Sequence, residues 1–329
     1  MITLPLPTAE RPGTWAPIAS QIGALRSCGI DVDVLEVGGP PKLKYLAAMR
    51  RLRALAAPCD IVHANFGYCG WVARSQLRRP VVVSFLGSDL LGTAGRQGKV
   101  TLSSRAVVAA NRRLARLVDA VIVKSAQMAR LLAPVPAHVI PHGVDTRRFR
   151  PLELDKARGR LGWNPDGRYV LFAGNPANPV KAFGVAAAAV ECARARSNRA
   201  IELVPLTGIA PDEMPVHMSA ADALILSSYW EGSPNVVKES MACNLPVVSV
   251  PVGDVPRLLA GVEPAAIRAR DPDALGGALT ELLDAPRRSN GHQELERKGI
   301  ELEPAAARVA AIYQEVVASS PRSATSRRS

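Results

Sequence analysis

The chain has 329 residues, of which 48% are hydrophobic, 21% charged and 4% aromatic. This length is too great for one small core and fits two domains, and the apolar content excludes wholesale disorder. No apolar run approaches the roughly 18 residues of a transmembrane helix. The five cysteines lack C-x-x-C spacing, which argues against a zinc knuckle or a redox pair. We therefore expect a cytoplasmic protein.

The excess of positive charge is confined to the first half of the chain. The formal net charge is +12; the first 150 residues contain 21 Lys/Arg and 8 Asp/Glu, an excess of +13, and the remainder stands at −1. Such a one-sided field indicates an anionic partner for that half. Aromatic residues are few and no nucleic-acid-binding motif is present, so we expect no nucleic-acid partner.

A basic segment at residues 41–57 makes an anionic membrane surface one candidate for this partner. It predicts an amphipathic helix whose apolar stripe, including Leu43 and Leu46, is flanked by cations. These cations are Lys42, Lys44, Arg50, Arg51 and Arg53. The pattern suits a peripheral position on the anionic inner face of the cell membrane. The alternative is a helix packed on a sheet with a solvated basic face.

Strand-like and helix-like segments alternate along both halves. In the first half, strands are predicted at residues 2–6, 30–37, 60–64, 80–86 and 120–124, with helices at 15–28, 41–57, 69–77 and 102–118. In the second, strands are predicted at 169–173, 201–206, 223–227 and 246–250, with helices at 180–196, 212–219, 234–243, 272–283 and 305–317. This alternation predicts βαβ units and parallel sheets. We expect domains at 1–150 and 151–318, a disordered tail at 319–329, and a ligand site to which both halves contribute.

Several common motifs are absent. The sequence has no G-x-G-x-x-G motif, which argues against a dinucleotide-dependent dehydrogenase. Asp31 and Asp33 form a D-x-D, which can bind a metal. Their apolar neighbours alternate with them, however, so the pattern predicts a strand with both aspartates on its solvent-exposed face. The histidines lack metal-ligand spacing. We expect neither a bound metal nor a cofactor.

The strongest signal lies between residues 221 and 254. A strand is followed by a loop with Glu231 and Gly232, and then by a helix for which we expect Ser233 as N-cap and Pro234 in the first position. Backbone N–H groups around Pro234, Asn235 and Val236, together with the helix dipole, would attract a diphosphate.

Two carboxylates frame that diphosphate position. Glu239 can accept hydrogen bonds from a vicinal diol such as ribose hydroxyls, and Glu231 can meet hydroxyls of a sugar. The alternative is that Ser-Pro merely starts a helix and both glutamates are solvated.

The Glu231-x7-Glu239 pair within EGSPNVVKESMACNLPVVSVPVGD closely resembles the retaining GT-B glycosyltransferases of family 4. The segment HVIPHGVDTRRFRP at residues 138–151 resembles the junction motif of the same family. Weaker matches are VDAVIVKSAQMARLL, DIVHA and FLGSD. The resemblance implies two Rossmann-like domains with parallel sheets facing a cleft, an acceptor-binding N-terminal domain and a donor-binding C-terminal domain.

The resemblance also implies roles for residues. Glu239 would hold the ribose of a nucleotide-sugar donor and Glu231 the donor sugar. The donor-side backbone would include Gly174, Asn175, Gly232, Ser233, Pro234, Asn235 and Val236. Lys181 would neutralise the diphosphate leaving group, although a solvated lysine at a helix start is the alternative. On the acceptor side the matching positions are Gly13 and Asp89.

Two departures from the family pattern bear on activity. The family often has Gly-Arg where this chain has Gly174-Asn175, and often has His where this chain has Leu86. A third departure, His142 in place of the usual Asn of the junction motif, is expected to have a structural effect only.

From these features we expect a glycosyltransferase that moves a sugar to a glycan or lipid-linked acceptor with retention, in surface polysaccharide biosynthesis. The alternatives are a sugar-nucleotide epimerase of the same fold and a degenerate, non-catalytic GT-B scaffold.

Overall fold

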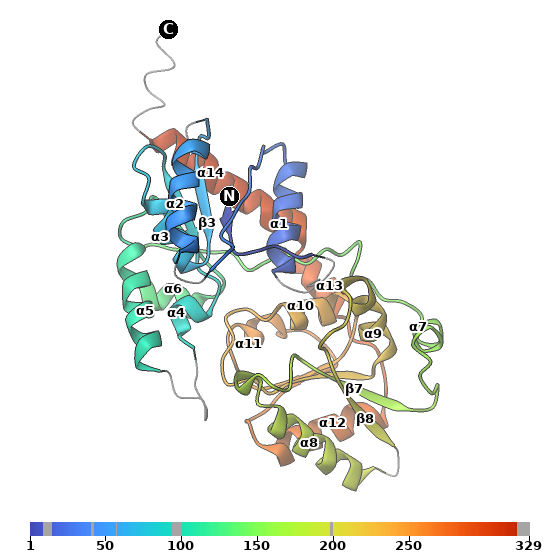
Figure 1. Ribbon diagram of the computed structural model, residues 1–329. Helices are drawn as coiled ribbons and strands as arrows, with labels where there is room; N and C mark the ends of the chain where they lie inside the picture. Colours follow the sequence, from blue (N-terminus) through green and yellow to red (C-terminus); the bar gives the residue numbers. More distant parts are fainter. Residues whose placement is uncertain (9–14, 41–42, 57, 94–100, 198–199, 321–329) are drawn as a thin grey trace. The chain divides into compact units, whose positions relative to one another are not determined.

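The computed structural model describes residues 1–8, 15–40, 43–56, 58–93, 101–197 and 200–320 (Figure 1). The chain divides into two compact units. One contains the described parts of residues 1–143 and the chain from Leu302 onward, and the other is Val144–Glu301. Each unit has its own parallel sheet, so the predicted pair of α/β domains is confirmed.

The first unit is built on a six-stranded parallel sheet with the order β2-β1-β3-β4-β5-β6. Its strands are β1 (Ile2–Thr3), β2 (Leu35–Glu36), β3 (Val62–Asn65), β4 (Val81–Ser84), β5 (Ala120–Val123) and β6 (His138–Val139). Its helices are α1 (Ala16–Ser27), α2 (Lys44–Leu55), α3 (Gly67–Arg74), α4 (Ser88–Leu91), α5 (Leu102–Leu114), α6 (Ala126–Leu132) and α14 (Leu302–Ser319). The strand predicted at 30–37 is wrong in length, because only Leu35–Glu36 pairs with β1.

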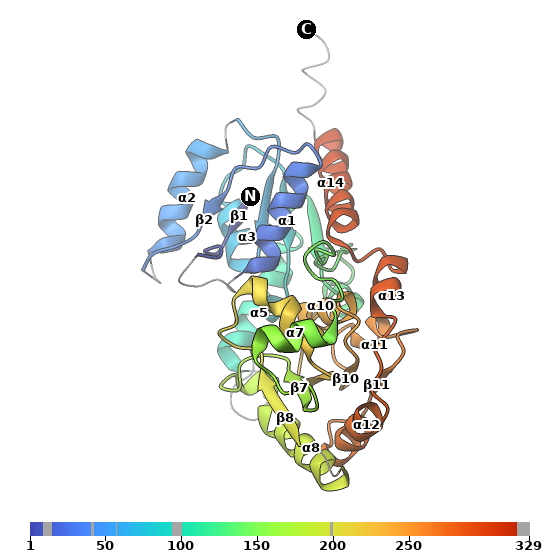
Figure 2. The same ribbon diagram turned by 90° about the vertical axis from the view of Figure 1, so that its right-hand side faces the viewer.

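Both faces of this sheet are covered. Val81 and Val83 of β4 belong to the core cluster that includes Val72 of α3. Val82, between them, belongs to the cluster that includes α1 and α14. This two-sided burial explains why the strands are continuous apolar runs rather than alternating ones. Figure 2 shows α1 and α14 side by side.

The last helix differs from expectation. The sequence pattern predicts that residues 305–317 belong to the second domain, but α14 packs in the first unit. The cause is an apolar face, including Val309 and Ile312, that shares a core with Ile18 of α1. Tyr313 also hydrogen-bonds the buried His63 of β3.

The two points where the chain changes units lie beside one another. The backbone N–H of Val144 donates to the carbonyl of Ile300 at 3.0 Å, and Val144 forms a parallel bridge with Glu301. The second unit therefore starts and ends at one place.

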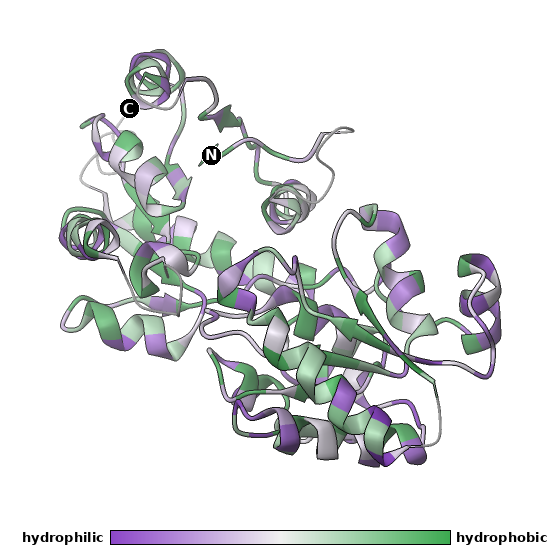
Figure 3. Cartoon of the chain, turned by 60° about the horizontal axis from the view of Figure 1, so that its bottom comes forward, coloured by the Kyte–Doolittle hydropathy of each residue, from purple (hydrophilic) through white to green (hydrophobic). Residues whose placement is uncertain are grey.

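The second unit is built on a five-stranded parallel sheet with the order β11-β10-β9-β7-β8. Its strands are β7 (Arg168–Phe172), β8 (Ile201–Pro205), β9 (Ala223–Leu226), β10 (Val247–Ser249) and β11 (Ala265–Ile267). Its helices are α7 (Leu154–Leu161), α8 (Phe183–Arg196), α9 (Met214–Ala220), α10 (Asn235–Ala242), α11 (Val255–Leu258), α12 (Pro272–Asp284) and α13 (Gly291–Arg297), with 3-10 turns η2 (Pro179–Lys181) and η3 (Pro211–Glu213). In Figure 3 the strands are largely hydrophobic, as two-sided burial requires.

Close packing of α8 on α12 depends on a glycine. A Cβ at Gly276 would lie 2.6 Å from the Cβ of Cys192 and 2.7 Å from the carbonyl oxygen of Ala189. Only a residue without a side chain lets the two helices approach this closely. None of the described helices is long and apolar enough to cross a membrane.

A buried ion pair joins α7 to the sheet of the second unit. Nη2 of Arg158 lies 2.9 Å from Oδ2 of Asp222, and the two side chains are 2% and 6% exposed. The same carboxylate accepts from the N–H of Tyr169 at 2.8 Å, and Arg158 also donates to the carbonyl of Ala220. Each charge is therefore matched by hydrogen bonds, which is the condition for burying a charge.

We expect Asp222→Ala to lower the free energy of unfolding by about 3–5 kcal/mol, because it leaves the Arg158 guanidinium buried without its counter-charge. Urea denaturation followed by circular dichroism measures this loss. The matched control is Asp212→Ala. The Asp212 side chain is 93% exposed and its carboxylate lies 3.2 Å from Arg148, so this substitution should cost less than about 1 kcal/mol. Equal losses in the two variants would contradict a special role for the buried pair.

Candidate functional site

The predicted donor-side residues gather at one edge of the second sheet. Gly174 and Asn175 follow β7, Lys181 ends η2, and the loop from Ser227 to Pro234 joins β9 to α10. These segments all follow the carboxyl ends of parallel strands, where open α/β sheets bind ligands. The structure thus brings together the donor-side positions that the sequence analysis named.

An ion pair lies at the centre of this edge. Nζ of Lys181 is 2.6 Å from Oε1 of Glu231, and the two side chains are 23% and 15% exposed. The aliphatic part of Lys181 lies over Gly174, where a Cβ would be 3.1–3.3 Å from it. Gly174 also has φ +143°, which other residues rarely adopt, so glycine serves both the turn and the lysine.

The helix predicted at 180–196 is interrupted at the site. Ala182 has φ 51° and separates η2 from α8, so Lys181 lies on a turn instead of inside a helix. The hydroxyl of Ser227 donates to the carbonyl of Lys181 at 2.9 Å, and the N–H of Tyr229 donates to the carbonyl of Val180 at 2.8 Å. These bonds hold the lysine turn against the loop that carries Glu231.

Arg270, which the sequence analysis missed, holds the same loop from β11. Its guanidinium donates to the carbonyls of Ser227 at 3.1 Å and Ser228 at 2.8 Å, and it lies 4.7 Å from the ring centroid of Tyr229. Because its partners are backbone carbonyls, no pairing of charged residues in the sequence could have indicated this role.

Gly253 fixes the loop from the side of β10. It has φ +59°, and a Cβ there would lie 2.6 Å from the carbonyl oxygen of Glu231 and 2.7 Å from that of Gly232. The two loops therefore touch through backbone atoms. Any side chain at Gly253 would displace Glu231.

The first turn of α10 differs from the prediction. The N-cap is Pro234, not Ser233, and the helix begins at Asn235. Pro234 has ψ 116°, which keeps it extended and outside the helix. No side chain caps this end. The N–H groups of the first turn, from Asn235 onward, therefore remain for a ligand to bind.

Asn175 takes part in the turn after β7. Its Oδ1 accepts from the N–H of Ala177 at 2.8 Å, and its carbonyl accepts from the N–H of Asn178 at 3.0 Å. A short polar residue that organises a turn thus occupies the position where the resembling family often has a cation.

Glu239 lies on α10, partly buried. Burial raises the pKa of its carboxyl to about 7, and the nearby charges of Lys238 and Arg148 oppose this shift. A carboxylate with such a pKa is costly to keep ionised without further hydrogen-bond donors. A ligand that donates hydrogen bonds would supply them.

Lys238 and Asp254 are two buried groups of opposite charge near Glu239, which the sequence analysis also missed. Lys238 is fully buried, and Asp254 is 7% exposed. Burial lowers the pKa of Lys238 to about 8 and raises that of Asp254, while each charge opposes the shift of the other. Lys238 follows Val236 and Val237 in the helix, and this lysine within an apolar turn is the signal that could have indicated the pair.

The two residues predicted on the acceptor side, Gly13 and Asp89, are not brought together in the described structure. Gly13 lies outside the described residues. Asp89 is 1% exposed, and its carboxylate accepts from the N–H groups of Gly87 at 2.8 Å, Leu86 at 3.0 Å and Gly67 at 3.2 Å. Burial raises its pKa to about 6 against the effect of these bonds. In this structure the carboxylate therefore organises backbone and is not presented to a ligand.

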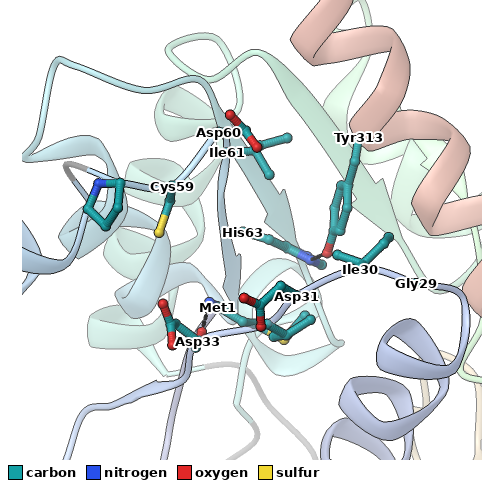
Figure 4. Close-up of a pocket in the computed structure, with 12 residues that line it drawn as sticks. Met1, Gly29, Ile30, Asp31, Asp33, Cys59, Asp60, Ile61, His63 and Tyr313 are labelled. Carbon is teal, nitrogen blue, oxygen red and sulfur yellow. Dashed lines mark hydrogen bonds between the residues drawn. The ribbon is translucent and has the colours of Figure 1, made fainter.

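A separate pocket of about 450 Å³ lies in the first unit (Figure 4). Asp31, Asp33 and Asp60 line it, and the side chains of His63 and Tyr313 meet within it. Burial, helped by Lys124, lowers the pKa of His63 well below its usual value. Asp31 and Asp33 do not lie on a strand as predicted, but both are exposed. Among the described side chains there is no group of three or more His, Cys, Asp or Glu that could hold a metal.

Known proteins match both units. Residues 6–143 match the model of the glycosyl transferase 4-like domain, and residues 170–285 match that of glycosyl transferases group 1. The second match includes the donor-side residues from Gly174 to Glu239 and also Arg270.

Relatives and solved structures agree with these models. The chain is 28% identical to D-inositol 3-phosphate glycosyltransferase 2 of Catenulispora acidiphila, covering 74% of this chain and 67% of that protein. It is 26% identical to the lipopolysaccharide core biosynthesis mannosyltransferase LpsB of Rhizobium meliloti, covering 93% and 94%. Sucrose-phosphate synthase from Thermosynechococcus elongatus superposes with a TM-score of 0.79 at 19% identity, covering 97% and 99%. The predicted GT-B fold is confirmed.

Proposed function

We propose that this chain, which is a glycosyltransferase of the GT-B fold, moves a sugar from a nucleotide-sugar donor to a glycan or lipid-linked acceptor with retention of anomeric configuration. The observation that carries the proposal is the Lys181–Glu231 pair, 2.6 Å apart at the carboxyl edge of the second sheet. A cation and a carboxylate in contact at a ligand-binding edge suit a donor that carries both phosphate and hydroxyl groups.

The diphosphate of the donor would lie between Lys181 and the first turn of α10. The uncapped N–H groups of that turn and the helix dipole favour an anion. A diphosphate would compete with Glu231 for the ammonium of Lys181. As the bond to the sugar breaks, negative charge grows on the leaving diphosphate, and a preorganised cation stabilises that charge.

Binding of the diphosphate would change what Glu231 does. Once Lys181 turns to phosphate, the Glu231 carboxylate gains lone pairs that can accept from hydroxyls of the donor sugar. Its backbone is held from two sides, by the Arg270-bound loop and by Gly253. The carboxylate would therefore stay in position through this exchange of partners.

Glu239 would accept hydrogen bonds from the ribose diol. Its carboxyl has a raised pKa because burial is not balanced by donors, and two hydroxyls would supply that balance. Charge-assisted hydrogen bonds of this kind are stronger than those between neutral groups. We propose that no divalent metal is required.

The acceptor and pathway are proposed from several observations. The names of the relatives include a lipopolysaccharide core mannosyltransferase and inositol phosphate glycosyltransferases. The first half of the chain carries the +13 charge excess. We propose a role in surface polysaccharide biosynthesis at the cytoplasmic face of the membrane.

The outer face of α2 supports a membrane position. Leu43 and Leu46 are 63% and 51% exposed, whereas Ala48 and Leu52 on the opposite face are buried. The exposed Arg50, Arg51 and Arg53 accompany the leucines. An anionic lipid surface would take the leucines into its interface and the arginines at its headgroups. Lys42 lies outside the described residues.

We expect Lys181→Ala to reduce kcat by about 100-fold or more, by analogy with other groups that stabilise developing charge. The melting temperature should change little, because a partly exposed ion pair contributes little stability. Initial rates with a nucleotide-sugar donor, measured in EDTA, and a thermal melt test both expectations. The control is Lys156→Ala, which removes an exposed i,i+3 pair with Glu153. Normal turnover with a lowered melting temperature would show a structural lysine.

Nucleotide affinity should rise with pH through Glu239. The free carboxyl is largely protonated below its pKa of about 7, and only the ionised form accepts from both ribose hydroxyls. The Kd for a nucleoside diphosphate should therefore fall by about tenfold from pH 6 to pH 8. Calorimetry of the protein and of Glu239→Gln separates this effect from titration of the ligand's own phosphate. Equal pH dependence in the two proteins would contradict the assignment.

The α2 surface should bind anionic vesicles reversibly. We expect co-sedimentation with vesicles containing phosphatidylglycerol at low salt, release at high salt, and none with phosphatidylcholine alone, since each basic residue near an anionic surface contributes about 1 kcal/mol. Changing Arg50, Arg51 and Arg53 to Glu should abolish binding. The charge-matched control changes Arg105, Arg112 and Arg113 on α5; equal loss there would indicate net charge alone.

A further inference from the structure

A second pocket of the first unit lies at the amino edge of its sheet, where β4 and β5 begin. It has a volume of about 320 Å³. Its walls come from the turn between α3 and β4, from Leu117 and Asp119 just before β5, and from Ser320 after α14. The donor-side residues all belong to the second unit, so this pocket is separate from the site described above.

The charge of this pocket is positive. Arg74, Arg78 and Arg79 line it, and the only carboxylate among its described lining residues is that of Asp119. Oδ2 of Asp119 accepts from the N–H of Val81 at 2.7 Å, so this carboxylate already has a partner at the start of β4. Three arginines against one aspartate leave a formal charge of +2 on the lining, which favours an anion.

A buried amide fixes the turn that carries two of these arginines. Gln76 is 5% exposed. Its Oε1 accepts from the N–H groups of Arg78 at 3.0 Å and Arg79 at 2.9 Å, and its Nε2 donates to the carbonyl of Arg79 at 2.9 Å. The backbone of both arginines is therefore in place before a ligand binds, which lowers the entropic cost of binding.

One of the three arginines has an alternative explanation. Arg74 lies in the last turn of α3, where a cation interacts favourably with the helix dipole. Arg78 and Arg79 lie beyond the helix, so the dipole does not account for them. Arg74 and Arg79 are partly buried, and a charge that is partly removed from water attracts an anion more strongly. A guanidinium has five N–H donors, so each arginine can bind an anion while it keeps its contacts to the protein.

Two leucines give the pocket an apolar part. Leu77 and Leu117 both line it, and they are 79% and 42% exposed. Leu77 lies on the turn that Gln76 fixes, directly before Arg78. A single exposed leucine is common on protein surfaces. Two exposed leucines in one arginine-lined pocket can be covered together by one apolar group, which points to a ligand that is both anionic and apolar.

We propose that this pocket binds a phosphomonoester, with the phosphate on the three arginines and an apolar substituent on Leu77 and Leu117. A phosphomonoester has three terminal oxygens and a charge of about −1.5 to −2 at pH 7. These match the +2 charge of the lining and the paired N–H groups of the guanidinium. A carboxylate would bring only one charge and two oxygens. The same chemistry occurs in a soluble phosphate and in a lipid headgroup, and the experiment separates these two sources.

Calorimetry with inorganic phosphate and with n-octyl phosphate, below its micelle concentration, tests the proposal. We expect octyl phosphate to bind about tenfold more tightly than inorganic phosphate, because its chain covers the two leucines. No binding of octyl phosphate, or no advantage over inorganic phosphate, would overturn the proposal.

Matched substitutions localise the binding. Arg78→Gln should weaken octyl phosphate binding about tenfold, the equivalent of a charge-assisted hydrogen bond, whereas Arg112→Gln on α5 should not. Leu77→Ser should remove most of the advantage of octyl phosphate, whereas Leu102→Ser, at a residue that is 80% exposed, should preserve it. All four residues are exposed, so the variants should remain folded, which thermal melts check. Phosphate bound at the donor side would be unaffected by these changes, so equal affinity in Arg78→Gln and Arg112→Gln would overturn the proposal.

Vesicles identify the source of the phosphate. The headgroup of phosphatidic acid is a phosphomonoester, and that of phosphatidylglycerol is a phosphodiester. At equal surface charge, stronger co-sedimentation with phosphatidic acid that is lost in Arg78→Gln supports the site with a lipid headgroup as its ligand. Equal co-sedimentation with both lipids, together with calorimetric binding of octyl phosphate, supports the site with a soluble phosphomonoester as its ligand.

Discussion

Parallel strand pairing is the constraint on which the rest of this structure depends. A parallel strand can be followed only by a crossover, so each crossover helix begins at the carboxyl edge of its sheet. In the second unit this brings Lys181 into contact with Glu231 although 50 residues separate them. In the first unit it brings together the rings of Trp15 at the start of α1 and Phe66 at the start of α3, whose centroids lie 5.9 Å apart. One backbone rule thus assembles both groups of residues.

Helices cover both faces of the sheet in the second unit, so charged side chains in its interior are removed from water and need partners. The Arg158–Asp222 pair lies before β7 and β9, at their amino ends, where it joins α7 to the core. The Lys238–Asp254 pair lies beside Glu239, where burial shifts the pKa of all three groups. The first pair needs only fixed hydrogen bonds. The second lies beside Glu239, for which we propose a ribose contact, so a nucleotide bound there would change the charge balance of these buried groups.

The sequence predicts those parts of the structure that depend on local pattern. Apolar runs such as Val81–Ser84 predict buried strands, and the Glu231-to-Glu239 string predicts which edge carries the site. Tertiary contacts set the rest. Ala182 takes a left-handed conformation between η2 and α8, whereas the apolar periodicity predicts one continuous helix over residues 180–196. Arg270 binds carbonyls contributed by another strand's loop, and the unit to which α14 belongs depends on the apolar face of α1.

The path of the chain has a consequence for biosynthesis. The core around α1 is complete only when α14 packs against it. Because α14 follows Val144–Glu301 in the chain, the ribosome synthesises it after the whole second unit, and α1 stays without this partner until then. The second unit is an insertion whose ends are tied together by the Val144–Glu301 bridge, so it can close on itself while still emerging from the ribosome. The first unit, begun earlier, finishes later. Until then, the apolar surface of α1 that α14 will cover stays open to chaperones or to aggregation.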